Sequence, residues 1–281
     1  MKRALLVLSL LVLLLPLQGA KPSLTATIPP LTLWLSEIAG PQMEITTLLK
    51  PGSSPHTFAL TVSAAASIHR SKGMVLVGAD LEPWLKEMGN PKKSSIPLFV
   101  LADHCAPLIG PADHPNPHLW LSPRRMAKAT PALGEFLARL DPANAPLYRK
   151  RAGEVKRRLE ELDKSLTQQS RSLSKRAVVV HHPSWNYLLE DYGIRVVATV
   201  ERNDEETPSP RRIQEILETM KRERVDVILT EPNVSAPWGR MLSQEGRGRE
   251  VVLDPLAFTP NLKSYAQFLE KNFLLLKDAL K

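Results

Sequence analysis

The chain is poor in residues that cross-link or stack. Its 281 residues include a single cysteine, Cys105, so no disulfide can form within the chain. This excludes the small secreted domains that disulfides hold together. Aromatic residues make up only 5% of the sequence. A His-Glu-x-x-His segment, the helical motif of zinc metalloproteases, is also absent. We interpret Cys105 as a small buried residue, with a soft metal ligand as the alternative.

Only the first twenty residues contain a long apolar run. Residues 1–3 form a short basic start, residues 4–17 are almost wholly apolar, and Gly19-Ala20 precede a polar segment. This layout is typical of a secretory signal peptide, because the run is too short for a comfortable membrane span. A signal anchor is the alternative, and Gln18 leaves the cleavage point open by a few residues. Since no cysteine follows the run, we expect no lipid anchor and a soluble protein in a bacterial periplasm.

The net charge is moderately basic. It is +8 at pH 7 by formal count, and loss of Lys2 and Arg3 with the signal peptide lowers it by two, to +6. The basic residues cluster in the segment 150–158 without a nucleic-acid motif, so we interpret this segment as a solvated helix face. With 43% hydrophobic and 23% charged residues, the composition is typical of a soluble globular protein.

Short apolar segments alternate with helical patterns in both halves of the chain. In the first half we expect strands at 23–28, 44–49, 74–77 and 96–101, and helices at 31–39, 61–70 and 81–88. In the second half we expect strands at 177–180, 195–200, 225–230 and 251–253, and helices at 184–192, 210–222, 238–245 and 262–280. This alternation indicates two similar α/β lobes, each with a mostly parallel sheet flanked by helices.

Between the halves lies one long helical pattern. Asp141-Pro142 predicts a helix start, and apolar residues then recur every three or four positions to about Ser174. We expect a rigid helix across both lobes, with a coiled-coil dimer as the alternative. The expected organisation is therefore a signal peptide at 1–20, an N-terminal lobe at 21–140, a linker helix at 141–174 and a C-terminal lobe at 175–281, with a metal-binding cleft between the lobes.

Four side chains that can bind a metal follow predicted strands. His56 and His118 lie in loops of the first half, whereas His182 and Asp254 directly follow strands of the second half. Ligands of such folds bind outside the carboxyl ends of the strands. His118 also stands between two prolines, which stiffen the backbone around its imidazole. Three imidazoles and a carboxylate suit Zn²⁺, so these four residues are candidate ligands of one ion held between the lobes.

The sequence around these residues resembles the metal-binding solute-binding proteins of ABC transporters, the zinc and manganese uptake group. The matching segments cover nearly the whole chain after the signal peptide, in order: Ser54–Thr61, Leu81–Leu85, Asn116–Pro123, His182–Tyr187, Tyr192–Ile194, Thr230–Pro232 and Leu253–Leu256. The resemblance implies two lobes joined by a long rigid helix, with His56, His118, His182 and Asp254 as the metal ligands. It also implies delivery of the metal to an ABC-type membrane permease.

The resemblance indicates the zinc branch of this group, because a histidine at the third ligand position resembles that branch and a glutamate accompanies manganese. Ser54, Asn116 and Ser122 stand where the family often has aspartate. Since outer carboxylates orient metal-bound imidazoles, their loss is expected to weaken binding. Glu231 and Tyr187 are expected to act around the ligands or in closing the lobes. The neighbours His181 and His182 point in opposite directions at a strand end, and the family spacing favours His182.

The leading hypothesis is a monomeric periplasmic protein that captures Zn²⁺ and delivers it to a permease, without enzymatic activity and without nucleic-acid binding. Uptake of Mn²⁺ or Fe²⁺ through the same site is the nearest alternative. A secreted zinc hydrolase is an alternative of another class, with Glu231 as its only plausible base. A surface adhesin or a metallochaperone with the same fold is the third. His104 and His114 are expected to be ordinary loop residues, and His69 to be structural or solvated.

Overall fold

A computed structural model describes the chain from residue 21 to 281, except residues 87–95, 112–113, 202–206 and 233–236. The predicted signal peptide at 1–20 lies outside the described residues. Among the helices within the described ranges, none combines the length and the hydropathy that crossing a membrane requires.

The N-terminal lobe is built on a four-stranded sheet. Its strands are β1 (Ser23–Ala26), β2 (Glu44–Thr47), β3 (Met74–Leu76) and β4 (Leu98–Val100). They pair in the order β2-β1-β3-β4, and every pairing is parallel. All three residues of β3 are buried, as expected for a strand that helices cover on both faces. Because all four strands run parallel, their carboxyl ends lie at one edge of the sheet.

The C-terminal lobe repeats this sheet. Its strands are β5 (Ala177–Val180), β6 (Arg195–Thr199), β7 (Val227–Thr230) and β8 (Arg249–Val252). They pair in parallel in the order β6-β5-β7-β8, which is the order of the first sheet. The predicted fold class, two similar lobes with parallel sheets flanked by helices, is confirmed.

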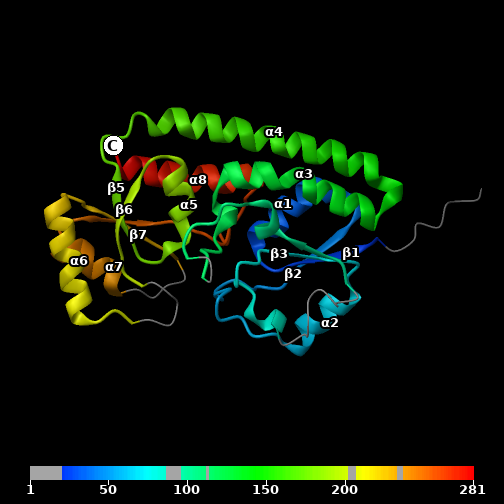
Figure 1. Cartoon of the computed structure of the whole chain (residues 1–281), viewed down its shortest axis with the longest axis horizontal. Coiled ribbons are helices and arrows are strands. Elements are labelled where there is room, and N and C mark those ends of the chain that lie inside the picture. The colour runs from blue at the N-terminus through cyan, green and yellow to red at the C-terminus, as the bar shows by residue number, and fades with distance from the viewer. Residues whose placement is uncertain (1–20, 87–95, 112–113, 202–206, 233–236) are drawn as a thin grey trace, which may run out of the picture.

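Helices pack around both sheets (Figure 1). The N-terminal lobe carries α1 (Pro29–Ala39) and α2 (Val62–Arg70), and the C-terminal lobe carries α5 (Asn186–Asp191), α6 (Pro210–Glu223), α7 (Pro237–Glu245) and α8 (Tyr265–Ala279). Thr61 caps α2 as its side chain accepts the Ala64 N–H. The helix predicted at 81–88 is a 3₁₀ turn at Pro83–Lys86 within the described residues.

The middle of the chain forms a helical hairpin that the sequence prediction missed in part. Its first arm is α3 (Pro123–Leu140), which no expected element covered, and its second arm is α4 (Ala145–Ser170). The predicted helix start at Asp141-Pro142 is a 3₁₀ turn, Pro142–Asn144, with Asp141 at its N-cap position, and this turn runs directly into α4. Asp141 also ends α3, so the 3₁₀ turn separates the two arms.

The helix α4 runs along the length of the molecule and spans both lobes (Figure 1). It packs against α1 of the N-terminal lobe, against α3, and against α8 of the C-terminal lobe. The apolar stripe predicted along this helix is buried within the chain, at Tyr148, Ala152, Val155, Leu159, Leu162 and Leu166. These residues belong to a core cluster that also contains side chains of both lobes. The stripe is therefore used for intramolecular packing.

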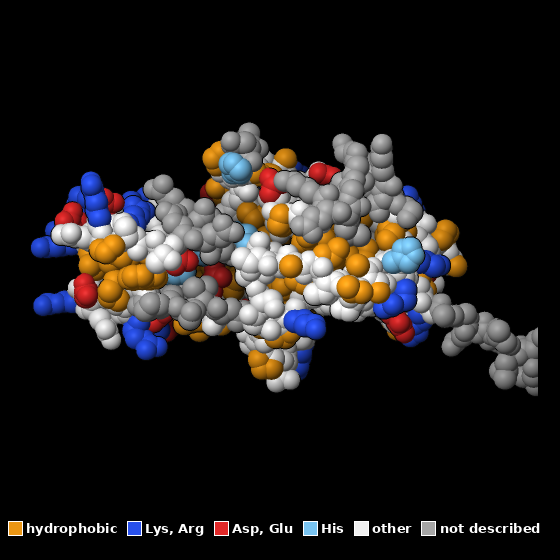
Figure 2. All heavy atoms as spheres, turned by 90° about the horizontal axis from the view of Figure 1, so that it is seen from below, with side chains coloured by type: hydrophobic (Ala, Val, Ile, Leu, Met, Phe, Trp, Pro, Cys, Tyr) orange, Lys and Arg blue, Asp and Glu red, His pale blue; other side chains and the backbone are white. Residues whose placement is uncertain are grey.

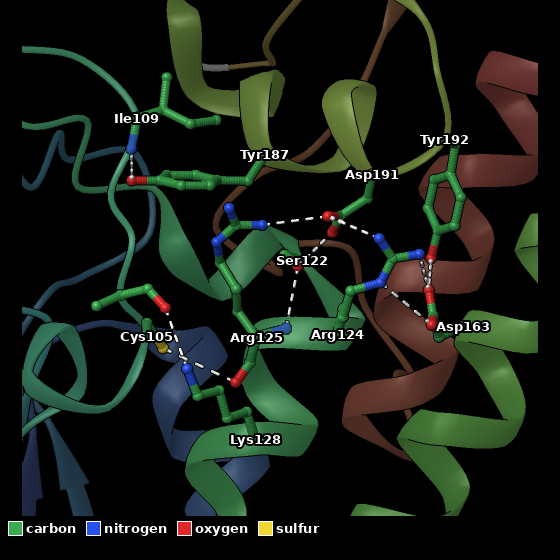
Figure 3. A network of polar contacts seen from close by, with 11 residues as sticks. Cys105, Ile109, Ser122, Arg124, Arg125, Lys128, Asp163, Tyr187, Asp191 and Tyr192 are labelled. Atoms are coloured by element: carbon green, nitrogen blue, oxygen red, sulfur yellow. Dashed lines mark hydrogen bonds and ion pairs between the residues drawn. The ribbon is translucent and has the colours of Figure 1, made fainter.

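A polar network joins the lobes beside α3 (Figure 3). The Asp191 carboxylate, at the end of α5, accepts hydrogen bonds from Ser122 Oγ at 2.5 Å and from Arg125 Nη1 at 3.1 Å. Arg124 Nη1 lies 3.5 Å from the same carboxylate, and the Arg125 guanidinium lies 4.3 Å from the centre of the Tyr187 ring. Burial raises the pKa of Asp191 in spite of these neighbouring cations.

Candidate metal centre

Three histidines from three separate loops meet between the lobes. His56 lies in the loop after β2, His118 in the loop after β4, and His182 two residues after β5. The Nε2 atom of His118 lies 3.1 Å from that of His56 and 3.3 Å from that of His182. His118 and His182 are buried, and His56 is partly exposed. The structure thus brings three of the four predicted ligands together.

The spacing of the three imidazoles fits one tetrahedral ion. With Zn–N bonds of about 2.0–2.1 Å, two nitrogens of a tetrahedral site lie about 3.3 Å apart. The observed separations of 3.1 and 3.3 Å are close to this value. One potential ligand atom of each histidine lies within 4.8 Å of those of the other two, and within the described ranges this is the only such group of histidine, cysteine and acidic residues.

The cluster lines a cavity of about 390 Å³ between the lobes. Glu201 and Glu231 lie on the wall of this cavity, together with His181. The surface is hollowed between the two lobes, and pale-blue histidine atoms are visible there (Figure 2). Two carboxylates beside the imidazoles give this cavity a charge that favours a cation.

His56 and His118 are each held by a local turn of the same kind. His56 and His118 each follow a proline, in the segments Ser54-Pro55-His56 and Asn116-Pro117-His118. Ser54 Oγ accepts the His56 N–H at 3.2 Å, and Asn116 Oδ1 accepts the His118 N–H at 2.9 Å. Proline has no N–H of its own, so the side chain two residues before the histidine reaches the next donor. Both imidazoles are therefore aimed by short-range sequence.

The structure holds His118 in the form that can bind a metal. Burial first, and then the charges of His182 and His56, lower the pKa of His118 well below its usual value. The ring is therefore neutral at pH 7 and has one nitrogen with a free lone pair. His118 Nδ1 lies 2.8 Å from Asn116 Oδ1, which can only accept, so the proton sits on Nδ1. The lone pair on Nε2 then faces the other two histidines.

His182 and its neighbour His181 lie differently. The His182 Nε2 atom belongs to the cluster, whereas His181 Nε2 lies 3.4 Å from the Glu201 carboxylate. The side chain that joins the other two histidines is therefore that of His182, as the family spacing favours.

The fourth predicted ligand, Asp254, lies outside the three-histidine group. Its Oδ1 accepts the Leu256 N–H at 3.0 Å, and its Oδ2 accepts the N–H and the hydroxyl of Thr259 at 2.7 and 2.8 Å. The carboxylate thus holds its own loop together in this structure, and the next residues, Pro255 and Leu256, line the cavity. A role for Asp254 as a ligand stays a prediction.

The two residues expected around the ligands take different places. Glu231 lines the cavity and accepts a hydrogen bond from the Ser184 hydroxyl. Tyr187 is fully buried, and its hydroxyl donates to the Asn116 carbonyl at 2.7 Å and accepts the Ile109 N–H at 3.0 Å. Tyr187 therefore connects the C-terminal lobe to the loop that carries His118.

Other candidate residues lie away from the cluster. The Cys105 thiol is buried, donates weakly to the Arg125 carbonyl at 3.8 Å, and has a pKa that burial raises to about 12. His104 stacks on Phe99 with ring centroids 4.8 Å apart. His69 is exposed on α2. The matched residue Glu82 is buried and accepts hydrogen bonds from its own loop and from Thr27, so it stabilises the fold.

Sequence reasoning missed the contacts that the His118 loop makes across the lobes. Asn116 Nδ2 donates to the Pro183 carbonyl at 2.7 Å, and Trp120 Nε1 donates to the Pro255 carbonyl at 2.7 Å. Each acceptor belongs to the proline that follows a candidate ligand, in His182-Pro183 and in Asp254-Pro255. The two ligand-proline pairs are visible in the sequence, but the side chains that donate to their proline carbonyls, those of Asn116 and Trp120, are not.

A family model matches nearly the whole of the described chain. The model of the zinc-uptake complex component A, periplasmic (ZnuA), matches residues 24–279. The chain belongs to this family. The ZnuA family consists of solute-binding components of zinc uptake, so the hypothesis of a secreted hydrolase has no support from the comparison.

Individual relatives of the ZnuA family are moderately similar to the chain. A protein of Thermotoga maritima named as a putative metal-binding protein is 28% identical over 279 residues, and the match covers 98% of this chain and 99% of that one. The zinc-binding lipoprotein AdcA of Streptococcus pneumoniae is 26% identical over 278 residues, with 92% of this chain covered. The chain spans only 56% of the length of AdcA.

A solved structure agrees over the same range. The crystal structure of ZnuA superposes with a TM-score of 0.84 at 25% identity, and the match covers 93% of this chain and 100% of that chain. Its agreement with the computed structure supports the arrangement of two lobes and one long helix.

Proposed function

We propose that this protein captures Zn²⁺ between its two lobes, in the periplasm, and delivers it to the membrane permease of an ABC-type uptake system. The observation that carries the proposal is the group of three Nε2 atoms from His56, His118 and His182, spaced for one tetrahedral ion. Membership of the ZnuA family supports uptake as its purpose.

The proposed ligand set is completed by Asp254. It follows β8 at the same edge of the C-terminal sheet as His182, which follows β5. Its loop is tied to the His118 loop through Trp120 Nε1 and the Pro255 carbonyl. A carboxylate beside three neutral imidazoles leaves a site with one negative charge, which suits a divalent cation. The lobes are assigned to residues 21–140 and 175–281, with α4 between them as the rigid connection.

Zinc titration tests the proposal. We expect one Zn²⁺ per chain in the wild type, and a Kd that rises by more than about tenfold in His118→Ala and in His182→Ala, since loss of an outer partner alone costs that much. His69→Ala is the matched control, because His69 is exposed on α2, and its Kd should be unchanged. Unchanged affinity in both site variants would refute the proposal.

Competition among metals tests the preference for zinc. Three imidazoles form a nitrogen-rich site, whereas oxygen ligands suit manganese. We expect Zn²⁺ to displace Mn²⁺ and Fe²⁺ at equal concentrations. A site that holds Mn²⁺ against equimolar Zn²⁺ would contradict the proposed cargo while leaving uptake of another metal possible.

A further inference from the structure

We infer that Asn116 is a positioning residue that selects the metal-binding tautomer of His118 and ties that imidazole to the opposite lobe. This inference rests on the proposed function for its meaning. The Asn116 side chain bonds both to the ring of one candidate ligand, His118, and to the loop that carries another, His182.

The orientation of the Asn116 amide is fixed by its partners. The His118 backbone N–H can only donate, so the amide atom 2.9 Å from it is the oxygen. The Pro183 carbonyl can only accept, so the amide atom 2.7 Å from it is the nitrogen. With the oxygen placed, His118 Nδ1 at 2.8 Å must be protonated, and Nε2 carries the lone pair.

An amide performs two tasks here that a carboxylate cannot combine. A carboxylate would accept from the His118 N–H and Nδ1–H, but it has no donor for the Pro183 carbonyl. At 2.7 Å from that carbonyl oxygen, the second carboxylate oxygen would be repelled. This chain, with asparagine in place of the expected aspartate, therefore gives up a negative charge near the metal and gains a bond between the lobes.

The chain itself contains a reduced version of the same turn. Ser54 accepts the N–H of His56 in the same Ser/Asn-Pro-His arrangement, with a hydroxyl on Cβ where asparagine has a carboxamide. A serine thus supports the turn. At position 116 it would keep the backbone contact and lose both the ring contact and the contact to Pro183. The variant Asn116→Ser is therefore expected to fold.

Three variants separate the two tasks. Asn116→Ser removes the ring contact and the interlobe bond, whereas Asn116→Asp keeps the ring contact and removes only the interlobe bond. Tyr187→Phe is the matched control, because it removes the bonds of the Tyr187 hydroxyl to the Asn116 carbonyl and to the Ile109 N–H without touching His118. Each variant is compared with the wild type by two measurements on metal-free protein. The ¹⁵N signals of the imidazoles report the tautomer of His118, and hydrogen exchange in residues 183–192 reports the stability of the contact between the lobes.

The expected results differ among the variants. In Asn116→Ser, His118 should populate both tautomers, and the Kd for Zn²⁺ should rise by about tenfold or more. In Asn116→Asp and in Tyr187→Phe, the tautomer should stay as in the wild type, and exchange in 183–192 should become faster. A wild-type tautomer in Asn116→Ser, or wild-type exchange in Asn116→Asp, would overturn the inference.

The result is distinguishable from failure of the proposed function. If the wild type binds no Zn²⁺ but the tautomer and exchange change as expected, the proposed function fails and the positioning role of Asn116 stands. If the wild type binds Zn²⁺ and Asn116→Ser binds it equally with an unchanged tautomer, the inference fails and the proposed function stands.

Discussion

At the scale of single residues, the candidate site depends on a buried imidazole, that of His118, whose pKa is lowered well below its usual value. His118 is 3% exposed, and its two neighbouring histidines make a positive charge costly there. A buried neutral imidazole binds a metal without first losing a proton. The same burial gives the metal-free protein a dependence on pH that an exposed histidine would not give.

The free energy of unfolding of the metal-free protein should fall as the pH is lowered through about 6.5, the ordinary value for histidine. Below that pH the unfolded chain protonates His118, but the folded chain does not, because its pKa is lowered. Each proton bound only by the unfolded chain costs about 1.4 kcal/mol per pH unit. Urea unfolding at pH 7.5, 6.5 and 5.5 measures this. His118→Asn should show a smaller slope, and an equal slope would contradict the assignment.

Asp254 permits a second prediction at this scale. Asp254→Ala should raise the Kd for Zn²⁺ by about tenfold or more, through loss of a ligand or of the bonds that hold its loop. Asp254→Asn distinguishes these causes, because an amide oxygen can still accept from the Leu256 N–H. Zinc titration of both variants is the measurement. Wild-type affinity in Asp254→Ala would remove Asp254 from the proposed ligand set.

At the scale of elements, the lobes are held to each other by groups at the ends of helices. The start of α3 carries Ser122 and Arg125, and the end of α5 carries Asp191 (Figure 3). The Asp191 side chain is only 6% exposed. A buried carboxylate between cations is costly to disrupt, because removing it leaves a buried cation without its partner.

Asp191→Ala should therefore lower the free energy of unfolding by about 3–5 kcal/mol. Asp226→Ala is the matched control, because the Lys175–Asp226 pair is also an ion pair but both side chains are nearly half exposed. Its loss should cost no more than about 1 kcal/mol. Urea unfolding of both variants measures the difference. Equal effects would show that the Asp191 network does not stabilise the interface between the lobes.

At the scale of the whole molecule, one core joins two sheets that are distant in sequence. The buried stripe of α4 packs with α1 and with α8 in a single cluster. Because this cluster contains side chains from both halves, loss of a residue of the stripe should weaken both. We therefore expect the chain to unfold as one cooperative unit.

Leu159→Ala tests this expectation. Leu159 is 1% exposed, so the substitution should cost about 2–5 kcal/mol and keep a single unfolding transition. Lys156→Ala, on the solvated face of the same helix, should change the free energy by less than about 0.5 kcal/mol. Tryptophan fluorescence and circular dichroism should give the same midpoint. Two separate transitions, only one of them shifted by Leu159→Ala, would contradict a shared core.

Much of the fold followed from local sequence. Strand-helix alternation predicted two parallel sheets, and the strands lie close to the expected ranges. The helix α3 was missed although Ser122-Pro123 is a typical cap with proline at the first helical position. Asp141-Pro142 carries a similar signal and begins a 3₁₀ turn that leads into α4. Both local signals therefore mark the start of a helical segment, whereas the packing of the two helices against each other depends on residues distant from either signal.

The sequence by itself determined which residues could bind a metal and how His56 and His118 are aimed, because a proline and a short polar side chain two residues earlier act within one turn. Only the tertiary structure decided that three imidazoles lie close enough to share one ion, that Asp254 holds its own loop, and that Asn116 reaches Pro183. The physical reason is the separation along the chain of the residues that interact. Turns and caps depend on neighbours in the chain, whereas the approach of two lobes depends on a core assembled from both.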